Sequence, residues 1–115
     1  MSEVREISKI IACTTIGTHN LYTCPLNCRA RIPLVFITNA GGNNTVTLKW
    51  YRKVQNLSFF IQGGKNLGLG ESIQFSGAYI VLEPEDRLDV AITAVGIVDV
   101  LCTAEEIFTA NKTRA

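Results

Sequence analysis

RLDVAITA at residues 87–94 decides the fold class, because its apolar side chains fall on every second position. In an extended chain successive side chains point to opposite faces, so this pattern predicts a strand with one buried and one wet face. Residues 45–50 alternate in the same way, and Val46, Leu48 and Trp50 are expected to face inward. The same period governs most of the chain, and it predicts an all-β protein.

Turn residues divide the chain into about eight short strands. Glycine and asparagine supply five of the six residues 39–44 and tolerate positive φ, Pro84 sets a turn, and Val95-Gly96 is typical of the tight turn of a hairpin. Many short strands with regular turn signals are typical of an antiparallel β-sandwich, either Ig-like or jelly-roll. The expected strands are residues 8–16, 20–24, 30–38, 45–54, 57–62, 71–76, 78–83 and 87–104, the last being a hairpin pair.

Composition predicts one folded domain over residues 1–115, with flexible termini at about 1–7 and 109–115. The chain has 115 residues, of which 47% are hydrophobic, and its net charge is +1, so hydrophobic burial can offset chain entropy. No apolar run approaches the ~20 residues of a membrane span, and the N-terminal stretch lacks the apolar segment of a signal peptide. We therefore expect a soluble domain made in a reducing cytosol, with no membrane partner.

Charge is distributed unevenly along the sequence. Residues 1–57 hold seven basic and two acidic side chains, a balance of +5, whereas residues 58–115 hold four basic and eight acidic ones, a balance of −4. This asymmetry indicates either ordinary surface charge or opposite patches for head-to-tail contact between copies. The densest basic cluster, Lys49, Arg52 and Lys53, is too sparse for a stripe that neutralises phosphates, so no nucleic-acid partner is expected.

The cysteines leave three interpretations open. Cys24 and Cys28 flank a short turn, and with Cys13 and His19, or with Cys102 in reserve, they could supply four zinc ligands. The paired C-x2-C spacing of a typical zinc site is absent, so free thiols in the core or the turn are favoured. A Cys24–Cys28 disulfide is the second interpretation, since thiols that stay reduced in the cytosol could oxidise if the protein were later released from the cell. No resident metal or other cofactor is expected.

Catalysis has little support in the sequence. His19 is the only histidine and falls in a predicted turn, and neither G-x-S-x-G nor H-E-x-x-H occurs. Residues 63–70 are glycine-rich, but Gly64-Lys65 precedes Asn66 rather than Ser or Thr, so a hairpin loop is expected instead of a phosphate cradle. The acidic residues near Pro84 lack the ligand spacing of a calcium loop. The chain is predicted not to be an enzyme.

Two aromatic doublets, Trp50-Tyr51 and Phe59-Phe60, suggest an interaction role instead. Neighbouring residues of a strand point to opposite faces, so all four rings cannot enter one core. We expect Tyr51 and Phe60 to face solvent, a second sheet or another chain. Exposed aromatic anchors of this kind are enriched at protein interfaces. Residues 30–38 are apolar on both faces, which predicts a central strand or one whose second face meets a partner.

Five short strings of the sequence form a recognisable series: LYTCP at residues 21–25, TN at 38–39, TVTLKWY at 45–51, GES at 70–72 and LEPED at 82–86. In this series the chain resembles the small β-sandwich virion proteins of tailed bacteriophages. The strings recur in that family as a hydrophobic-Tyr-Thr-x-Pro segment, a Thr-Asn turn, a Thr-Val-Thr-Leu strand, a Gly-Glu-Ser turn and a Leu-x-Pro-x-Asp turn. Cys24 and Cys28 depart from the family, in which small or aliphatic residues are usual at these positions.

The resemblance implies a structural virion subunit, made in the host bacterial cytoplasm and present in several copies. The first expectation is a capsid decoration or cement protein that bridges major capsid subunits. A neck or tail component that forms a ring is the alternative, followed by a carbohydrate-binding module of a tail fibre. For contact between subunits the predicted residues are Tyr51, Phe60, Lys65, Asn66 and Leu67, whereas a carbohydrate platform would need Trp50-Tyr51 with Trp50 facing outward.

Overall fold

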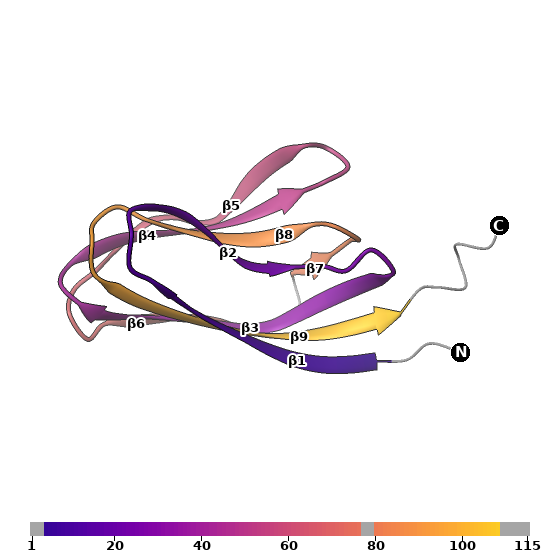
Figure 1. Cartoon of the computed structure of the whole chain (residues 1–115), viewed down its shortest axis with the longest axis horizontal. Helices are drawn as coiled ribbons and strands as arrows, with labels where there is room; N and C mark the ends of the chain where they lie inside the picture. The colour runs from indigo at the N-terminus through magenta and orange to yellow at the C-terminus, as the bar shows by residue number, and fades with distance from the viewer. Residues whose placement is uncertain (1–3, 77–79, 109–115) are drawn as a thin grey trace.

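The structure is a computed structural model that describes residues 4–76 and 80–108. These residues form nine β-strands in two antiparallel sheets that pack face to face (Figure 1). The strands are β1 (Val4–Cys13), β2 (Gly17–Thr23), β3 (Cys28–Gly41), β4 (Asn44–Arg52), β5 (Leu57–Leu67), β6 (Ser72–Ser76), β7 (Val81–Leu82), β8 (Arg87–Ile92) and β9 (Ile97–Phe108). The predicted antiparallel β-sandwich is confirmed.

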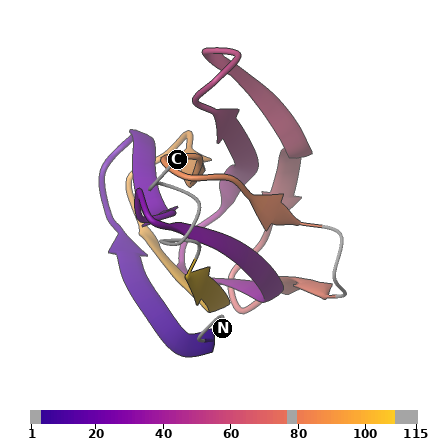
Figure 2. The same ribbon diagram turned by 90° about the vertical axis from the view of Figure 1, so that its right-hand side faces the viewer.

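The strand order is that of a jelly roll. Sheet A has the order β1-β9-β3-β6, with β7 also paired to β3, and sheet B has the order β2-β8-β4-β5. β6 and β7 together act as one interrupted strand beside β3. Most consecutive strands lie in opposite sheets, so the first strand pairs with the last and the chain winds around the core, as Figure 2 shows from the end.

The core fills the space between the sheets with alternating side chains. Val35, Ile37 and Val100 come from sheet A, and they face Leu48 and Val90 from sheet B; all five are fully buried. Each such side chain stabilises the fold by about 1.5–3 kcal/mol relative to an exposed position. The inward direction predicted for Val46 and Leu48 is confirmed, whereas Trp50 is only half-buried at the margin of the core.

The hairpin predicted over residues 87–104 is wrong. β8 belongs to sheet B and β9 to sheet A, so residues 93–96 cross between the sheets instead of joining paired neighbours. The crossing needs glycine at position 96, where a Cβ atom would lie 2.5 Å from the carbonyl oxygen of Gly41. Alternation and turn residues are the same for a hairpin and for a crossing of this kind, so the pattern could not distinguish them.

Several strand boundaries also differ from the predictions. β5 continues through Gly63 and Gly64 to Leu67, because the glycine-rich segment pairs with β4 rather than forming a loop. Residues 4–7, predicted to fray, pair with β9, which itself runs as a strand to Phe108. The predicted strand at 78–83 is observed only at Val81–Leu82, and its first two residues lie outside the described residues, as do 109–115.

The described residues include no long apolar helix of the kind that spans a lipid bilayer.

Candidate interaction surface

The β4–β5 hairpin projects from one side of the sandwich (Figure 1). Among the described strands, β5 is an edge strand that pairs only with β4. Its register with β4 shifts twice, between Val46 and Leu48 and between Leu48 and Lys49. Each shift is a β-bulge that places an extra residue in β5, and bulges bend a strand and increase its twist. The far end of the hairpin therefore extends beyond the core, and both of its faces remain accessible.

One face of the hairpin forms a shallow aromatic shelf. Trp50 lies opposite Phe59 in the register, and with Arg52 and Gln55 they line a hollow of about 280 Å³. The guanidinium of Arg52 lies 5.6 Å from the centroid of the Trp50 ring, a cation–π contact that covers one face of the indole. Leu57, opposite Arg52, extends the shelf toward the tip of the hairpin and is 55% exposed.

The other face carries Tyr51 and Phe60. The Arg87 guanidinium stacks 4.1 Å from the Tyr51 ring centroid, and the Tyr51 hydroxyl donates a 2.5 Å hydrogen bond to Oδ1 of Asn56. Phe60 has no such cover and is 71% exposed, beside Lys49 on the paired strand. Tyr51 is thus held against the sheet, while Phe60 is free to contact another molecule.

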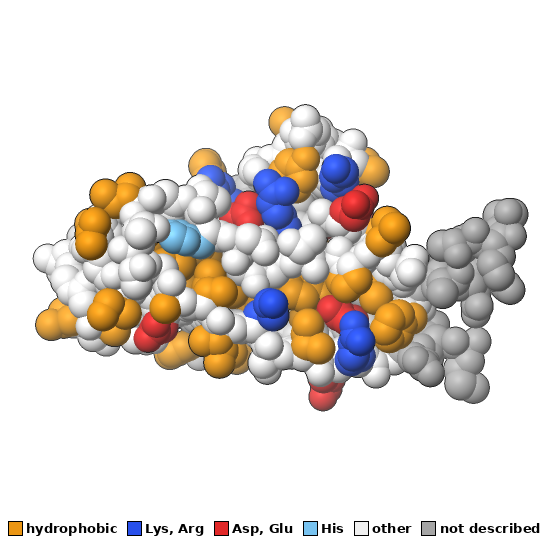
Figure 3. All heavy atoms as spheres, in the orientation of Figure 1, with side chains coloured by type: hydrophobic (Ala, Val, Ile, Leu, Met, Phe, Trp, Pro, Cys, Tyr) orange, Lys and Arg blue, Asp and Glu red, His pale blue; other side chains and the backbone are white. Residues whose placement is uncertain are grey.

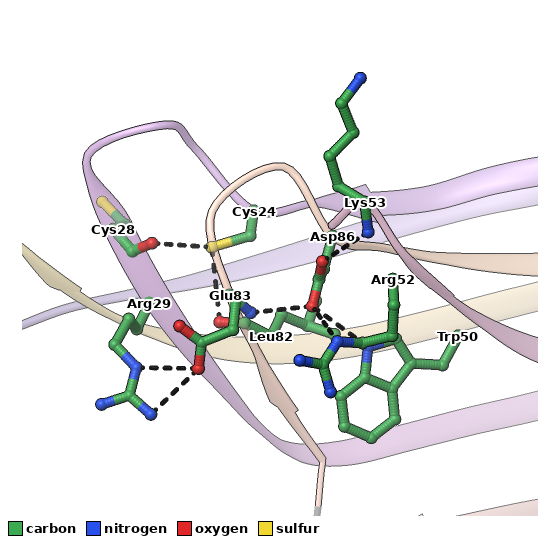
Figure 4. A network of polar contacts seen from close by, with 9 residues as sticks. All are labelled: Cys24, Cys28, Arg29, Trp50, Arg52, Lys53, Leu82, Glu83 and Asp86. Atoms are coloured by element: carbon green, nitrogen blue, oxygen red, sulfur yellow. Dashed lines mark hydrogen bonds and ion pairs between the residues drawn. The ribbon is translucent and has the colours of Figure 1, made fainter. Parts of the chain in front are cut away.

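Asp86 fixes the hairpin to the rest of the molecule (Figure 4). Its carboxylate is 1% exposed and accepts hydrogen bonds from the backbone N–H of Lys53 at 2.9 Å and of Glu83 at 3.0 Å. The indole N–H of Trp50 donates to the same carboxylate at 3.4 Å, and Nε of Arg52 lies 3.3 Å from it. These contacts hold the base of the hairpin tip to the loop before β8, so the hairpin is presented rigidly.

The predicted contact residues do not form one cluster. Tyr51 and Phe60 lie near the tip, whereas Lys65 and Asn66 pair with the opposite end of β4, about 16 Å away along the strand. Lys65 and Asn66 are exposed, but the Leu67 side chain is 1% exposed and packs in the core. Leu67 therefore offers no side chain to a neighbour.

Three exposed apolar residues were missed by the sequence analysis: Val54, Leu57 and Phe59. Val54 is 91% exposed at the tip and Phe59 is 44% exposed. Leu57, Phe59 and Ile61 alternate, a pattern that by itself predicts one buried face and does not indicate that β5 extends beyond the opposite sheet. The consecutive apolar residues 59–61 are the signal that could have indicated accessibility on both faces.

The outer face of sheet A is a second apolar surface. Ile10, Leu101 and Phe36 lie side by side across β1, β9 and β3, and Ile10 is 73% exposed. Beside this row is a hollow of about 310 Å³, lined in part by Glu6, Pro33 and Thr103. The prediction that the segment 30–38 is central and apolar on both faces is confirmed, because β3 lies between β9 and β6.

The cysteines are buried free thiols, so the Cys24–Cys28 disulfide is absent from the structure. The Cys24 thiol donates to the carbonyl oxygen of Cys28 at 3.3 Å (Figure 4), and burial raises its pKa to about 12. Burial also raises the pKa of Cys102 to about 11 and that of Cys13 above its usual value. Protonated, buried thiols are poor nucleophiles.

Residues 4–76 and 80–108 contain no group of three or more His, Cys, Asp or Glu side chains arranged to hold a metal ion. His19 lies within β2 rather than in a turn, and its Nε2 atom is 2.8 Å from the carbonyl oxygen of Thr15.

A buried carboxylate joins the two sheets near both ends of the described chain. Glu106 on β9 is 1% exposed and accepts a 2.5 Å hydrogen bond from the Tyr22 hydroxyl on β2. Arg5 on β1 donates to the same carboxylate through Nε at 3.0 Å and Nη2 at 2.6 Å, and its guanidinium lies over the Phe108 ring. Burial and the bond to Glu106 raise the pKa of Tyr22 far above its usual value.

The sequence matches no known protein family and no curated protein. A solved chain from Bacillus endospore appendages, described as a novel family of disulfide-linked pili, superposes with a TM-score of 0.60 at 14% identity, covering 94% of this chain and 90% of that chain. A chain from the acid-stable capsid of Helicobacter pylori bacteriophage KHP30 gives 0.59 at 10% identity, covering 92% and 93%. A chain of infectious bursal disease virus, Gx strain, gives 0.55 at 9% identity, covering 95% and 33%. At these identities the likeness shows the fold alone: a jelly-roll sandwich resembling those of a phage capsid chain and a spore-pilus subunit.

Proposed function

We propose that this chain is a structural virion protein of a tailed bacteriophage that decorates the capsid and bridges neighbouring major capsid subunits. The observation that carries the proposal is the agreement in length and fold with a chain of the KHP30 capsid, since nearly all of both chains superpose. A compact domain of this kind can add buried area across a joint between shell subunits. Because it would bind the assembled shell and not the free subunits, it would stabilise the shell by mass action.

The projecting hairpin supports this role. It presents Val54, Leu57 and Phe60, all more than half exposed, on a base fixed by the buried Asp86 carboxylate. A fixed apolar projection loses little conformational entropy on binding, which favours a stable contact. The buried thiols fit a structural role too, because their ionisation is suppressed.

Particle composition tests the proposal. In virions purified from a lysate whose phage encodes this chain, the protein should co-purify with the shell, and gel densitometry should give a copy number comparable with the major capsid band. A neck or tail ring would give far fewer copies, and immunogold labelling would then mark the tail end of the particle. Absence of the protein from washed virions would overturn the proposal.

A single-residue variant refines the test. Phe60→Ala should reduce incorporation into particles, whereas Val95→Ala, which alters an equally exposed apolar residue at the other end of the molecule, should not. Equal incorporation of both variants would remove the hairpin from the shell contact.

The second candidate function is a subunit of an extracellular appendage, favoured by the likeness to the Bacillus endospore pili. Those pili are described as disulfide-linked, whereas every cysteine of this chain is buried in the sandwich. Non-reducing gels of the native assembly distinguish the two functions: an appendage linked in that way would give covalent ladders, and a capsid protein with buried thiols would run as a monomer.

The carbohydrate-binding alternative needs an aromatic ring with a free face near a loop. Trp50 is the largest ring at the shelf, but Arg52 covers one of its faces and its indole N–H is directed to Asp86. We therefore place this function third.

A further inference from the structure

We propose that copies of this protein bind one another head to tail, with the β4–β5 hairpin of one copy packed on the outer face of sheet A of the next. The inference deepens the proposed function, and it rests on that function only in requiring a subunit that assembles. It commits to a second copy of this chain as the partner of both surfaces.

The hairpin surface is apolar at its tip and basic around it. Val54 and Phe60 are 91% and 71% exposed. Residues 44–67, which form the hairpin, include four basic and no acidic side chains. Asp86 neutralises Arg52, but Lys53 and Lys49, which lies opposite Phe60, have no ion-pair partner within the described part of the chain. Hydrophobic side chains and Lys or Arg side chains lie together on this projection in Figure 3.

The receiving surface is also apolar, but acidic residues border it. Glu6 and Asp99 lie on the same outer face of sheet A as the row formed by Ile10, Leu101 and Phe36, one on either side of it along the strands. Both carboxylates are exposed, and neither forms an ion pair with another described residue. The hollow of about 310 Å³ between Glu6 and Pro33 offers space for a large apolar side chain, which is how interface anchors usually bind.

The signs of the unpaired charges determine how two copies meet. Packing sheet A against sheet A would oppose Glu6 and Asp99 to like charges, and packing hairpin against hairpin would oppose lysines to lysines. The hairpin on sheet A pairs an apolar surface with an apolar surface and unpaired bases with unpaired acids, which gives electrostatic complementarity. The contact is therefore heterologous rather than two-fold symmetric.

The two surfaces lie on opposite sides of the molecule. In Figures 1 and 2 the hairpin projects from the sheet B side, and sheet A forms the other side. One copy can therefore use both surfaces at once, and repetition of the contact gives a ring or an open chain of subunits.

The area available suits a protein interface. β1 and β9 pair over ten residues, so the outer face of sheet A measures about 33 Å along the strands. Four strands about 4.8 Å apart give a width of about 19 Å and an area of roughly 600 Å², close to the ~800 Å² that each partner buries in a standard complex.

Two variants that each damage one surface test the inference. Leu57→Ser with Phe60→Ser damages the hairpin, and Glu6→Lys with Ile10→Lys damages the sheet A face at its edge strand; all four positions are exposed. Analytical ultracentrifugation at low salt should show the unaltered protein as a concentration-dependent series of oligomers. Each double variant alone should sediment as a monomer. Val95→Ser is the matched control and should assemble as the unaltered protein does.

Mixing the two double variants gives the decisive result. Each retains the surface that the other lacks, so an equimolar mixture should form a heterodimer and nothing larger. A two-fold interface would predict no rescue on mixing, and that outcome would overturn the inference, as would a protein that stays monomeric at all concentrations. Circular dichroism melts of each variant, matching the unaltered protein, ensure that lost assembly is not lost folding.

The result is separable from the proposed function. A protein that stays monomeric in solution but still enters virions leaves capsid decoration intact and overturns only the contact between copies. If the hairpin variant alone then fails to enter virions, the hairpin binds the shell instead of a second copy.

Discussion

The two ends of the sandwich are closed by different chemistry. At one end, which we call the asparagine end, the side chains of Asn39 and Asn44 are buried and bond to loop backbone. At the other, the carboxylate end, Asp86 and Glu106 are buried and bond to backbone N–H groups, a tyrosine hydroxyl and arginines. A carboxamide both donates and accepts, whereas a carboxylate only accepts.

The difference follows from what each end holds. The asparagine end fixes three tight connections to one another: the Asn44 carboxamide bonds Thr93 and Ala94, and Asn39 bonds Gly42 and Leu67. The carboxylate end instead holds segments that extend away from the core, namely the β4–β5 hairpin and the start of β1. The end that carries the projecting hairpin is thus the end stabilised by charge.

Removing the buried Asn44 side chain at the asparagine end should have the largest effect on the free energy of unfolding. The Asn44 side chain accepts hydrogen bonds from the N–H groups of Thr93 at 2.9 Å and Ala94 at 3.1 Å, and it donates one to the carbonyl oxygen of Ala94 at 2.7 Å. Asn44→Ala leaves these three backbone groups without their partner. We expect a loss of about 3 kcal/mol in the free energy of unfolding. Urea unfolding followed by circular dichroism measures it. The exposed neighbour Asn43→Ala is the matched control; a loss as large there would contradict the role given to Asn44.

At the carboxylate end, Tyr22→Phe should have a smaller effect. The change removes one hydroxyl and leaves Oε2 of Glu106 without its donor, while Arg5 continues to bond Oε1. We expect a loss of about 1–3 kcal/mol. A double-mutant cycle with Glu106→Gln isolates the coupling between the two side chains. If the losses of the two single variants add up to that of the double variant, the Tyr22–Glu106 hydrogen bond does not stabilise the contact between the sheets.

The sequence predicted the β-sandwich but not the buried polar side chains that hold its two ends. Alternation in 45–50 and 87–94 identifies strands, because burial of one face imposes a period of two. Which sheet each strand joins depends on long-range pairing, so a turn such as Val95-Gly96 could not be recognised as a crossing. The sequence indicates that Asn39 and Asn44 are turn residues able to adopt positive φ. In the structure Gly42 adopts φ 78°, whereas the two asparagine side chains donate hydrogen bonds to the backbone of Leu67 and Ala94.

The candidate surface was predicted in part. The aromatic doublets predicted that Tyr51 and Phe60 face away from the core, because neighbouring side chains of a strand point to opposite faces of its sheet. The prediction that Leu67 contacts a partner is wrong for its side chain, which is buried in the core. A glycine-rich stretch suggests a loop, but two β-bulges allow β5 to continue through it as a strand paired with β4. Glu106 was not identified either, because its partners lie 84 and 101 residues away in sequence.

High pH should lower the free energy of unfolding through Cys24, whose backbone is bonded to the Asp86 loop at the carboxylate end. Burial raises the pKa of Cys24 to about 12 from an ordinary value of 9.0, so between these values the unfolded chain releases a proton that the folded chain retains. The free energy of unfolding should be nearly constant below about pH 8 and fall as the pH rises toward 12, by about 2 kcal/mol between pH 8.5 and 10.5. Tyr22 contributes in the same direction. Cys24→Ala should flatten the slope; an unchanged slope would contradict this assignment.

The smallest effect on stability is expected at the hairpin. Phe60→Ser alters a side chain that is 71% exposed and is not among the described side chains packed against the core, so the free energy of unfolding should change by less than about 0.5 kcal/mol. The same change should reduce assembly, because it removes an apolar anchor from the hairpin. Urea unfolding and sedimentation of one preparation compare the two quantities directly. A large loss of stability would mean that Phe60 belongs to the core. It would then contradict the comparison in which the asparagine end stabilises the fold and the hairpin at the carboxylate end binds a partner.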